Sequence, residues 1–167
     1  LMSAIAGVDQ ALWDIKGKYH DAPIHQLMGG KVRDRIRVYA WVGGETPEKI
    51  AESAQNAIAS GFSATKMVIT GALQIVDSIA KVETAAAKVA GIREAVGSDL
   101  DIAVDFHGRI HRPMAPVLIK AIEPYSPLFI EEPVLPEHLE FMADLRRSTH
   151  IPIATGERLF SRYDFKR

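Results

Sequence analysis

The sequence contains no cysteine, which excludes disulfide bonds and thiolate metal sites. It also has no uninterrupted apolar run of the roughly 18 residues that a membrane-spanning helix needs. Neither sign of charge is in excess, because 20 Lys and Arg residues face 21 Asp and Glu residues and leave a formal net charge of −1. No overall field therefore favours nucleic acid or an anionic membrane surface. We expect a cytoplasmic protein that binds neither.

What the sequence does contain is typical of a folded domain. Of its 167 residues, 47% are hydrophobic and 25% are charged, and this balance argues against disorder. A chain of this length is long enough for one domain with a substantial hydrophobic core.

Helical and strand patterns alternate along the chain. Apolar residues recur at helical spacing in 3–18, and the β-branched and aromatic run 35–42 predicts a first strand. Thr46 and Pro47 predict the start of a helix that Gly61 ends. Further strands are predicted at 64–69, 101–106, 128–131 and 151–154, with helices at 77–96, 113–122 and 137–149.

Strands joined by helical crossovers pair in parallel, so the sequence predicts an α/β protein. Doubly wound sheets and barrels share this rhythm. The residues after the first predicted strand, Gly43-Gly44-Glu45, lack the third glycine of a dinucleotide-binding loop, and this favours a barrel. A complete eightfold barrel takes about 250 residues, so we predict a partial (β/α)8-type barrel with about five strands.

Acidic residues stand at or just past the ends of three successive predicted strands. Asp105, Glu131 and Glu157 follow one another at equal steps of 26 residues. One strand and helix unit has about this length, so the spacing predicts three carboxylates at one level of the rim where barrel active sites lie. Clustered carboxylates need a cation, a shared proton or basic partners, and oxygen ligands favour Mg²⁺ or Mn²⁺. The alternative is that each carboxylate caps the following helix.

Two residues close to these acids in the sequence, His107 and Glu132, have different predicted roles. His107 follows Asp105 by two residues, on the same strand face, and we predict that it is a general acid. A metal ligand, a structural donor to a carbonyl and a pocket wall are its alternative roles. Glu132 points away from Glu131, because adjacent strand residues face opposite sides, so we expect it to face a helix or an ion pair.

Lys66 and Arg158 are the predicted substrate contacts. Lys66 lies on the second predicted strand, where an ion pair with Asp105 or another acid is the alternative. The Arg158 side chain is suited to binding a substrate carboxylate through two parallel hydrogen bonds. Its alternative is to pair with a neighbouring ligand carboxylate.

Four segments carry a resemblance to a known family that spans essentially the whole chain. They are 4–18 (AIAGVDQALWDIKGK), 104–109 (VDFHGR), 127–134 (PLFIEEPV) and 156–162 (GERLFSR). In these segments the chain resembles the mandelate racemase subgroup of the enolase superfamily, and most closely its D-galactonate dehydratases. The resemblance implies a modified (β/α)7β barrel.

The resemblance also implies a carbon–oxygen lyase. Asp105, Glu131 and Glu157 would bind Mg²⁺, and His107 would protonate the departing hydroxide. The family removes the proton next to a sugar-acid carboxylate, forms an enediolate that the metal stabilises, and eliminates the β-hydroxyl to leave a 2-keto-3-deoxy acid. For the full-length parent this implies a small-molecule substrate, a hexonate such as D-galactonate, and we also expect a homo-oligomer.

The resemblance further implies how the chain is divided. Residues 1–30 would be the end of the capping-domain helical segment, and residues 31–167 the first part of the barrel domain. The general base of the family, a histidine on a later strand, would lie beyond Arg167. We therefore expect the fragment alone to be inactive.

Two alternatives to a dehydratase remain. Racemases and cycloisomerases of the superfamily carry Lys-x-Lys on the second strand, whereas Lys66 is followed here by Met67 and Val68, which favours the dehydratase. A non-catalytic, truncated barrel segment that keeps the metal site is the second alternative. Its open sheet edges would invite pairing with another chain.

Overall fold

The computed structural model describes residues 1–166 and divides the chain into two compact units, Leu1–Arg37 and Val38–Arg167. The first unit contains the helices α1 (Met2–Tyr19) and α2 (Ile24–Leu27). The helix predicted at 3–18 is confirmed as α1, and Lys16 and Lys18 in its last turn suit the negative end of the helix dipole. No helix within residues 1–166 is long and apolar enough to cross a membrane.

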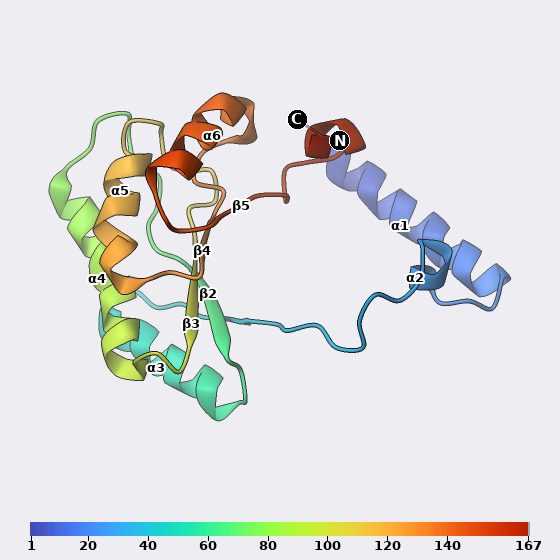
Figure 1. The fold of residues 1–167 in the computed structure, drawn as a ribbon, viewed down its shortest axis with the longest axis horizontal. Helices are drawn as coiled ribbons and strands as arrows, with labels where there is room; N and C mark the ends of the chain where they lie inside the picture. The colour runs from blue at the N-terminus through green and yellow to red at the C-terminus, as the bar shows by residue number, and fades with distance from the viewer. Residues whose placement is uncertain (167) are drawn as a thin grey trace. The chain divides into compact units, whose positions relative to one another are not determined.

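The second unit contains a sheet and the helices that follow its strands (Figure 1). The strands are β1 (Ala40–Trp41), β2 (Ala64–Val68), β3 (Asp101–Asp105), β4 (Phe129–Glu131) and β5 (Ile153–Ala154). The helices are α3 (Pro47–Ala59), α4 (Ile79–Val96), α5 (Ala115–Ile122), α6 (Leu139–Ser148) and α7 (Arg162–Lys166), with short 3₁₀ helices η1 (Glu123–Tyr125) and η2 (Pro136–His138).

All five strands pair in parallel, in the order β1-β2-β3-β4-β5. Each strand therefore lies beside the strand that precedes it in the sequence, as in a barrel, whereas a doubly wound sheet reverses its strand order. The predicted α/β class and the partial barrel are confirmed.

The helix α3 begins and ends where its sequence signals predict. The Thr46 hydroxyl oxygen accepts a hydrogen bond from the backbone N–H of Lys49 at 3.4 Å, and Pro47 occupies the first helical position. The chain leaves the helix through Gly61, whose φ of +87° is readily adopted only by glycine.

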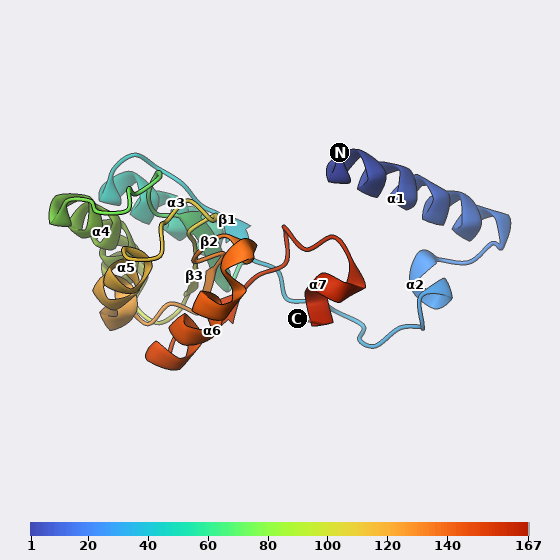
Figure 2. The ribbon, with the colours of Figure 1, turned by 90° about the horizontal axis from the view of Figure 1, so that it is seen from above.

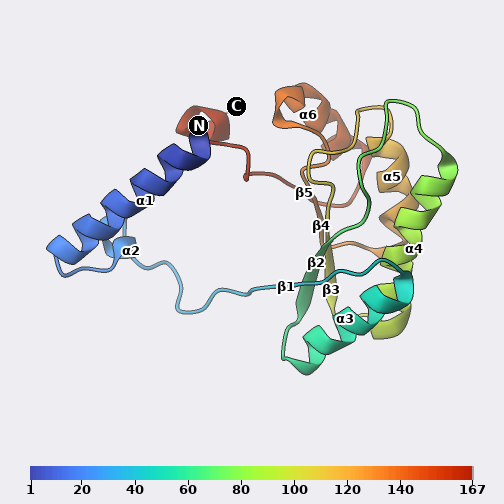
Figure 3. The ribbon, with the colours of Figure 1, turned by 180° about the vertical axis from the view of Figure 1, so that it is seen from behind.

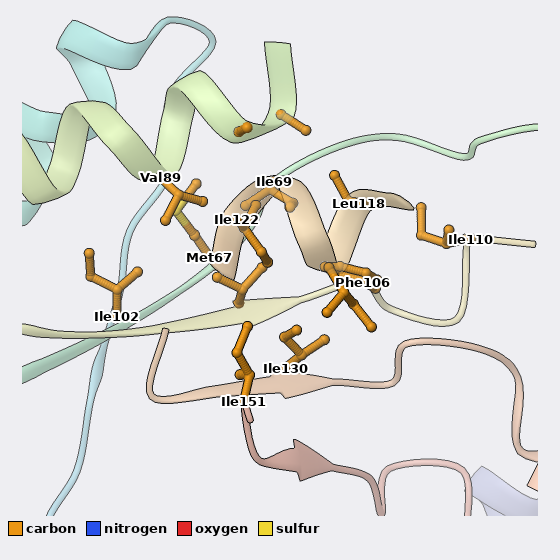
Figure 4. Close-up of a cluster of buried hydrophobic side chains, with 14 of the residues drawn as sticks. Met67, Ile69, Val89, Ile102, Phe106, Ile110, Leu118, Ile122, Ile130 and Ile151 are labelled. Carbon is orange, nitrogen blue, oxygen red and sulfur yellow. The ribbon is translucent and has the colours of Figure 1, made fainter. Parts of the chain in front are cut away.

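The hydrophobic core lies between the sheet and its helices. Figure 2 and Figure 3 show α3, α4 and α5 together on one side of the sheet. Met67, Val104 and Ile130 occupy paired positions on β2, β3 and β4, and all three side chains are fully buried. They pack with Val89, Ile122 and further apolar side chains of the helices (Figure 4). This face of the sheet therefore forms part of the hydrophobic core.

The first strand is much shorter than predicted. The sequence predicts strand over 35–42, but β1 contains only Ala40 and Trp41. Ala40 pairs with Thr65 and Trp41 with Lys66, so β1 is registered on only part of β2. Strand propensity depends strongly on context, so composition alone does not determine where a strand begins. The other predicted strand boundaries agree with the structure to within two residues.

Replacing a buried isoleucine of α4 tests this core. Ile92 is fully buried, whereas Ile79 of the same helix is 63% exposed. We expect Ile92→Ala to lower the free energy of unfolding by about 2–5 kcal/mol, because the cavity adds to the lost burial. Ile79→Ala should change it by less than about 0.5 kcal/mol. Urea unfolding of the full-length protein, followed by circular dichroism, measures both, and equal losses would contradict the assigned core.

Candidate active site

The side chains of Asp105 and Glu131 lie next to each other at the carboxyl ends of β3 and β4. The two residues are direct partners in the parallel register. Their neighbours Val104 and Ile130 point into the core, so the two carboxylates point to the opposite face of the sheet. Asp105 is 2% exposed in its side chain and Glu131 is 17% exposed. The 26-residue step from Asp105 to Glu131 therefore brings these two carboxylates to the same level of the sheet, as the sequence predicts.

Glu157 reaches the same region in a different way. Glu131 pairs with Ala154 of β5, so Glu157 lies three residues beyond the end of the paired strand. The prediction that equal spacing alone sets all three carboxylates at one level is wrong for this second step. The loop 155–158, and not the strand register, determines where the Glu157 side chain lies.

Lys66 joins the two paired carboxylates. Its Nζ donates a hydrogen bond of 2.6 Å to Oε2 of Glu131 and lies 3.4 Å from Oδ2 of Asp105. The Nζ also lies 5.4 Å from the ring centroids of Tyr39 and Trp41, a distance at which an ammonium group is attracted to an aromatic face. The alternative predicted for Lys66, an ion pair with Asp105 or another acid, is present in the structure.

The surroundings of Lys66 keep it protonated. Burial disfavours its charge, but the hydrogen bond to Glu131 and the negative charges of Asp105 and Glu131 outweigh burial and raise the pKa of Lys66 above its usual value. The ammonium group is therefore a cation that offsets the repulsion between the two carboxylates.

His107 lies between Asp105 and Glu157. Its Nδ1 is 3.7 Å from Oδ2 of Asp105 and 3.5 Å from Oε1 of Glu157. The strand ends at Asp105, so strand alternation does not place His107 there. A left-handed turn does, because His107 has a φ of +55° and its backbone N–H donates a 2.7 Å hydrogen bond to Oδ1 of Asp105. Nδ1 is buried and has no hydrogen-bond partner within residues 1–166.

Arg158 contacts the chain's own groups. Its Nη2 donates a 2.8 Å hydrogen bond to the backbone oxygen of His107 and lies 3.3 Å from Oε1 of Glu157. Its Nε lies 3.7 Å from Oε2 of Glu132. The alternative predicted for Arg158, pairing with a neighbouring carboxylate, is therefore present, and so is the ion pair expected for Glu132.

The carboxylate oxygens of the site suit a hard cation, although in this structure they lie against basic side chains. Asp105, Glu131 and Glu157 supply carboxylate oxygens, which Mg²⁺ prefers. Within the described residues, however, no three His, Asp or Glu side chains converge as a ligand set. Lys66 draws Glu131 to itself, and Arg158 and His107 flank Glu157. Assignment of the three carboxylates as metal ligands stays a prediction.

Removing the Lys66 ammonium group should destabilise the metal-free protein. Lys66→Met leaves the buried Asp105 carboxylate and the partly buried Glu131 carboxylate without their cation, and breaking a buried pair in this way costs about 3–5 kcal/mol. Because the folded state raises the pKa of Lys66, the stabilisation is complete below the unfolded value of about 10.4 and is lost as the pH rises through the higher folded value.

The difference in urea midpoint between the wild type and Lys66→Met, measured in chelator, should therefore stay constant from about pH 6 to 9 and shrink above about pH 10.4. Lys18→Met is the control, since it removes an exposed pair with Asp14 and should change the midpoint little. A Lys66→Met effect that has already vanished by about pH 9 would contradict the raised pKa.

Comparison with known proteins gives the family. Residues 49–167 match the enolase C-terminal domain-like family, and residues 1–29 match the N-terminal domain of mandelate racemase and muconate lactonizing enzyme. The chain therefore belongs to the enolase superfamily, in the group of mandelate racemase and muconate lactonizing enzyme. The resemblance predicted from four sequence segments is confirmed.

Individual relatives agree with this placement. The chain is 55% identical to a D-galactonate dehydratase of Cronobacter sakazakii and 53% identical to one of Pectobacterium atrosepticum, over 100% of this chain and 44% of each relative. It thus spans less than half the length of these proteins. A solved mandelate racemase/muconate lactonizing enzyme of Jannaschia sp. CCS1 matches with a TM-score of 0.89 at 37% identity, over 98% of this chain and 46% of that one.

Proposed function

We propose that the full-length protein is a Mg²⁺-dependent hydro-lyase that dehydrates a hexonate such as D-galactonate to a 2-keto-3-deoxy acid. The observation that carries the proposal is the convergence of Asp105, Glu131, Lys66 and His107 at the carboxyl ends of neighbouring parallel strands. The dehydratase names of the two relatives support the same reaction.

In this proposal Asp105, Glu131 and Glu157 hold the cation, and Mn²⁺ is an acceptable substitute for Mg²⁺. The bound ion would supply positive charge that stabilises the negative charge developing next to the substrate carboxylate. Asp105 and Glu131 end β3 and β4, and Glu157 follows β5, so all three proposed ligands come from the carboxyl ends of parallel strands, the rim where barrel active sites lie.

Lys66 is the proposed contact for the anionic end of the substrate. Its ammonium stays charged, and its position beside the carboxylate pair lets it attract a sugar-acid carboxylate electrostatically. The second proposed substrate contact, Arg158, already donates to His107 and lies against Glu157. We therefore favour a role for Arg158 in holding these two residues over a direct role in binding.

His107 is the proposed general acid. Its Nδ1 has no hydrogen-bond partner among residues 1–166, so a proton on this ring is not committed to another protein group. Donating that proton to the departing β-hydroxyl would let it leave as water.

The division of the chain belongs to the same proposal. We assign residues 1–30 to the end of the capping domain and 31–167 to the first part of the barrel. The separate family matches at 1–29 and 49–167 support this, and so does the division of the structure after Arg37. The cytoplasmic location and the homo-oligomeric state stay predictions.

The reaction itself can be tested with a panel of sugar acids. The full-length protein, supplied with Mg²⁺, should convert at least one hexonate to a product that has lost one water and contains a 2-keto group. Mass spectrometry and a colorimetric assay for 2-keto acids detect this product. Chelator should abolish its formation and added Mg²⁺ should restore it. Racemisation or lactone cyclisation of an acid, with no loss of water, would instead favour the racemase or cycloisomerase alternative.

Replacing His107 separates an acid from a ligand. His107→Asn should leave the Mg²⁺ affinity unchanged and lower kcat for elimination by about 100- to 10,000-fold, the usual contribution of a positioned acid. The exposed His150 provides the control, and His150→Asn should change neither quantity. If calorimetry shows that Mg²⁺ affinity collapses in His107→Asn, then His107 is a metal ligand.

A further inference from the structure

Glu132 is a fully buried carboxylate that the proposed reaction does not use. Its exposed fraction is 0%, although it directly follows the proposed ligand Glu131. It also has a φ of +45°, a backbone conformation that is uncommon outside glycine. Burying a carboxylate and holding a left-handed backbone both cost free energy, so the surroundings must compensate for both.

The Glu132 side chain holds the loop that carries Glu157. Its Oε1 accepts hydrogen bonds from the Thr155 hydroxyl at 2.6 Å and from the Gly156 backbone N–H at 3.1 Å. Glu157 follows these two residues and lies beyond the paired part of β5. The position of the Glu157 carboxylate therefore depends on this loop, and Glu132 is the buried group to which the loop is anchored.

The Glu132 backbone and Arg158 extend the same anchor to His107. The backbone oxygen of Glu132 accepts a 2.9 Å hydrogen bond from the N–H of Gly108. Arg158, whose Nε faces Glu132, donates to the backbone oxygen of His107. Gly108 leaves space for this contact, since a Cβ there would lie 3.3 Å from Nε of Arg158.

The Glu132–Arg158 pair is poorly built for stability alone. Oε2 of Glu132 and Nε of Arg158 are both buried without a hydrogen bond within the described residues, and their separation is 3.7 Å. A buried ion pair with incomplete hydrogen bonding rarely repays its desolvation. What the pair does achieve is to join the loops after β3, β4 and β5, which carry His107 and Glu157.

We propose that Glu132 is a positioning residue that sets Glu157 and His107 relative to the paired carboxylates Asp105 and Glu131. The proposal rests on the proposed function, because it gives these residues their roles as ligands and acid. Residues that orient metal ligands in this way typically contribute about 10- to 100-fold to metal affinity or activity.

The test is Glu132→Gln in the full-length protein. The amide oxygen can still accept from Thr155 and Gly156, but the charge facing Arg158 is lost. The matched control is Glu123→Gln, because Glu123 accepts a 2.9 Å hydrogen bond from the Thr149 hydroxyl, joining η1 to the segment before β5. Each variant thus removes the charge of a glutamate that accepts a hydrogen bond from a threonine, at opposite ends of β4 and β5.

Three measurements distinguish positioning from simple stabilisation. Calorimetry on the metal-free protein should show about 10- to 100-fold weaker Mg²⁺ binding for Glu132→Gln and unchanged binding for Glu123→Gln. Amide hydrogen exchange should accelerate in segments 106–109 and 155–159 of Glu132→Gln only. The melting temperatures of the two variants should be similar, and kcat should fall more than KM rises in Glu132→Gln.

The results also separate this proposal from the proposed function. Wild-type affinity and unchanged exchange in Glu132→Gln would overturn the positioning role, whatever reaction the protein catalyses. Equal losses of affinity in both variants would overturn it too, because the effect would then be global. If the wild type binds Mg²⁺ but dehydrates no sugar acid, the function fails, while altered affinity and exchange in Glu132→Gln would still support positioning.

Discussion

Asp105 and Glu131 stand next to each other because β3 and β4 pair in parallel register, and two adjacent carboxylates repel one another. The Lys66 ammonium, on β2, offsets this repulsion by contacting both. The register that brings the acids together also brings Val104 against Ile130 on the core face. A shift of either strand by one residue would therefore bury the carboxylates among the helices and expose the core. Stability and the site thus depend on the same pairing.

The residues that follow the carboxyl ends of β3 and β4 include two with an uncommon backbone conformation. His107 and Glu132 both have positive φ, and they follow the carboxylate that ends β3 or β4 by two residues and by one residue, respectively. Neither is glycine, so each conformation needs compensation from its surroundings. The Asp105 carboxylate accepts from the His107 N–H, and the Glu132 oxygen accepts from the Gly108 N–H. Each of these residues is therefore held by a hydrogen bond, and the second bond joins the loops after β3 and β4.

Much of this arrangement follows from the sequence, because hydrophobic periodicity and strand alternation are local properties. They give the alternating elements, the opposed directions of Glu131 and Glu132, and the pairing of Asp105 with Glu131. Two expectations failed for non-local reasons. The run 35–42 has strand character throughout, yet β1 contains only Ala40 and Trp41, because strand propensity depends on context. Glu157 has the predicted spacing, yet Glu131 pairs with Ala154, and no periodicity predicts the loop that follows.

Glu132 is the residue whose part sequence reasoning could not assign, because its partners lie more than twenty positions away in the loop after β5. Glu131 ends β4, and the chain turns at Glu132 through a left-handed backbone conformation. One of them can therefore face the Lys66 ammonium at the open side of the sheet while the other is buried against Arg158. Two consecutive residues thus have different roles. Glu131 supplies a carboxylate to the candidate site, and Glu132 supplies the carboxylate that holds the loop after β5 in place. This explains why an ionisable side chain occupies a fully buried position next to the proposed metal ligands.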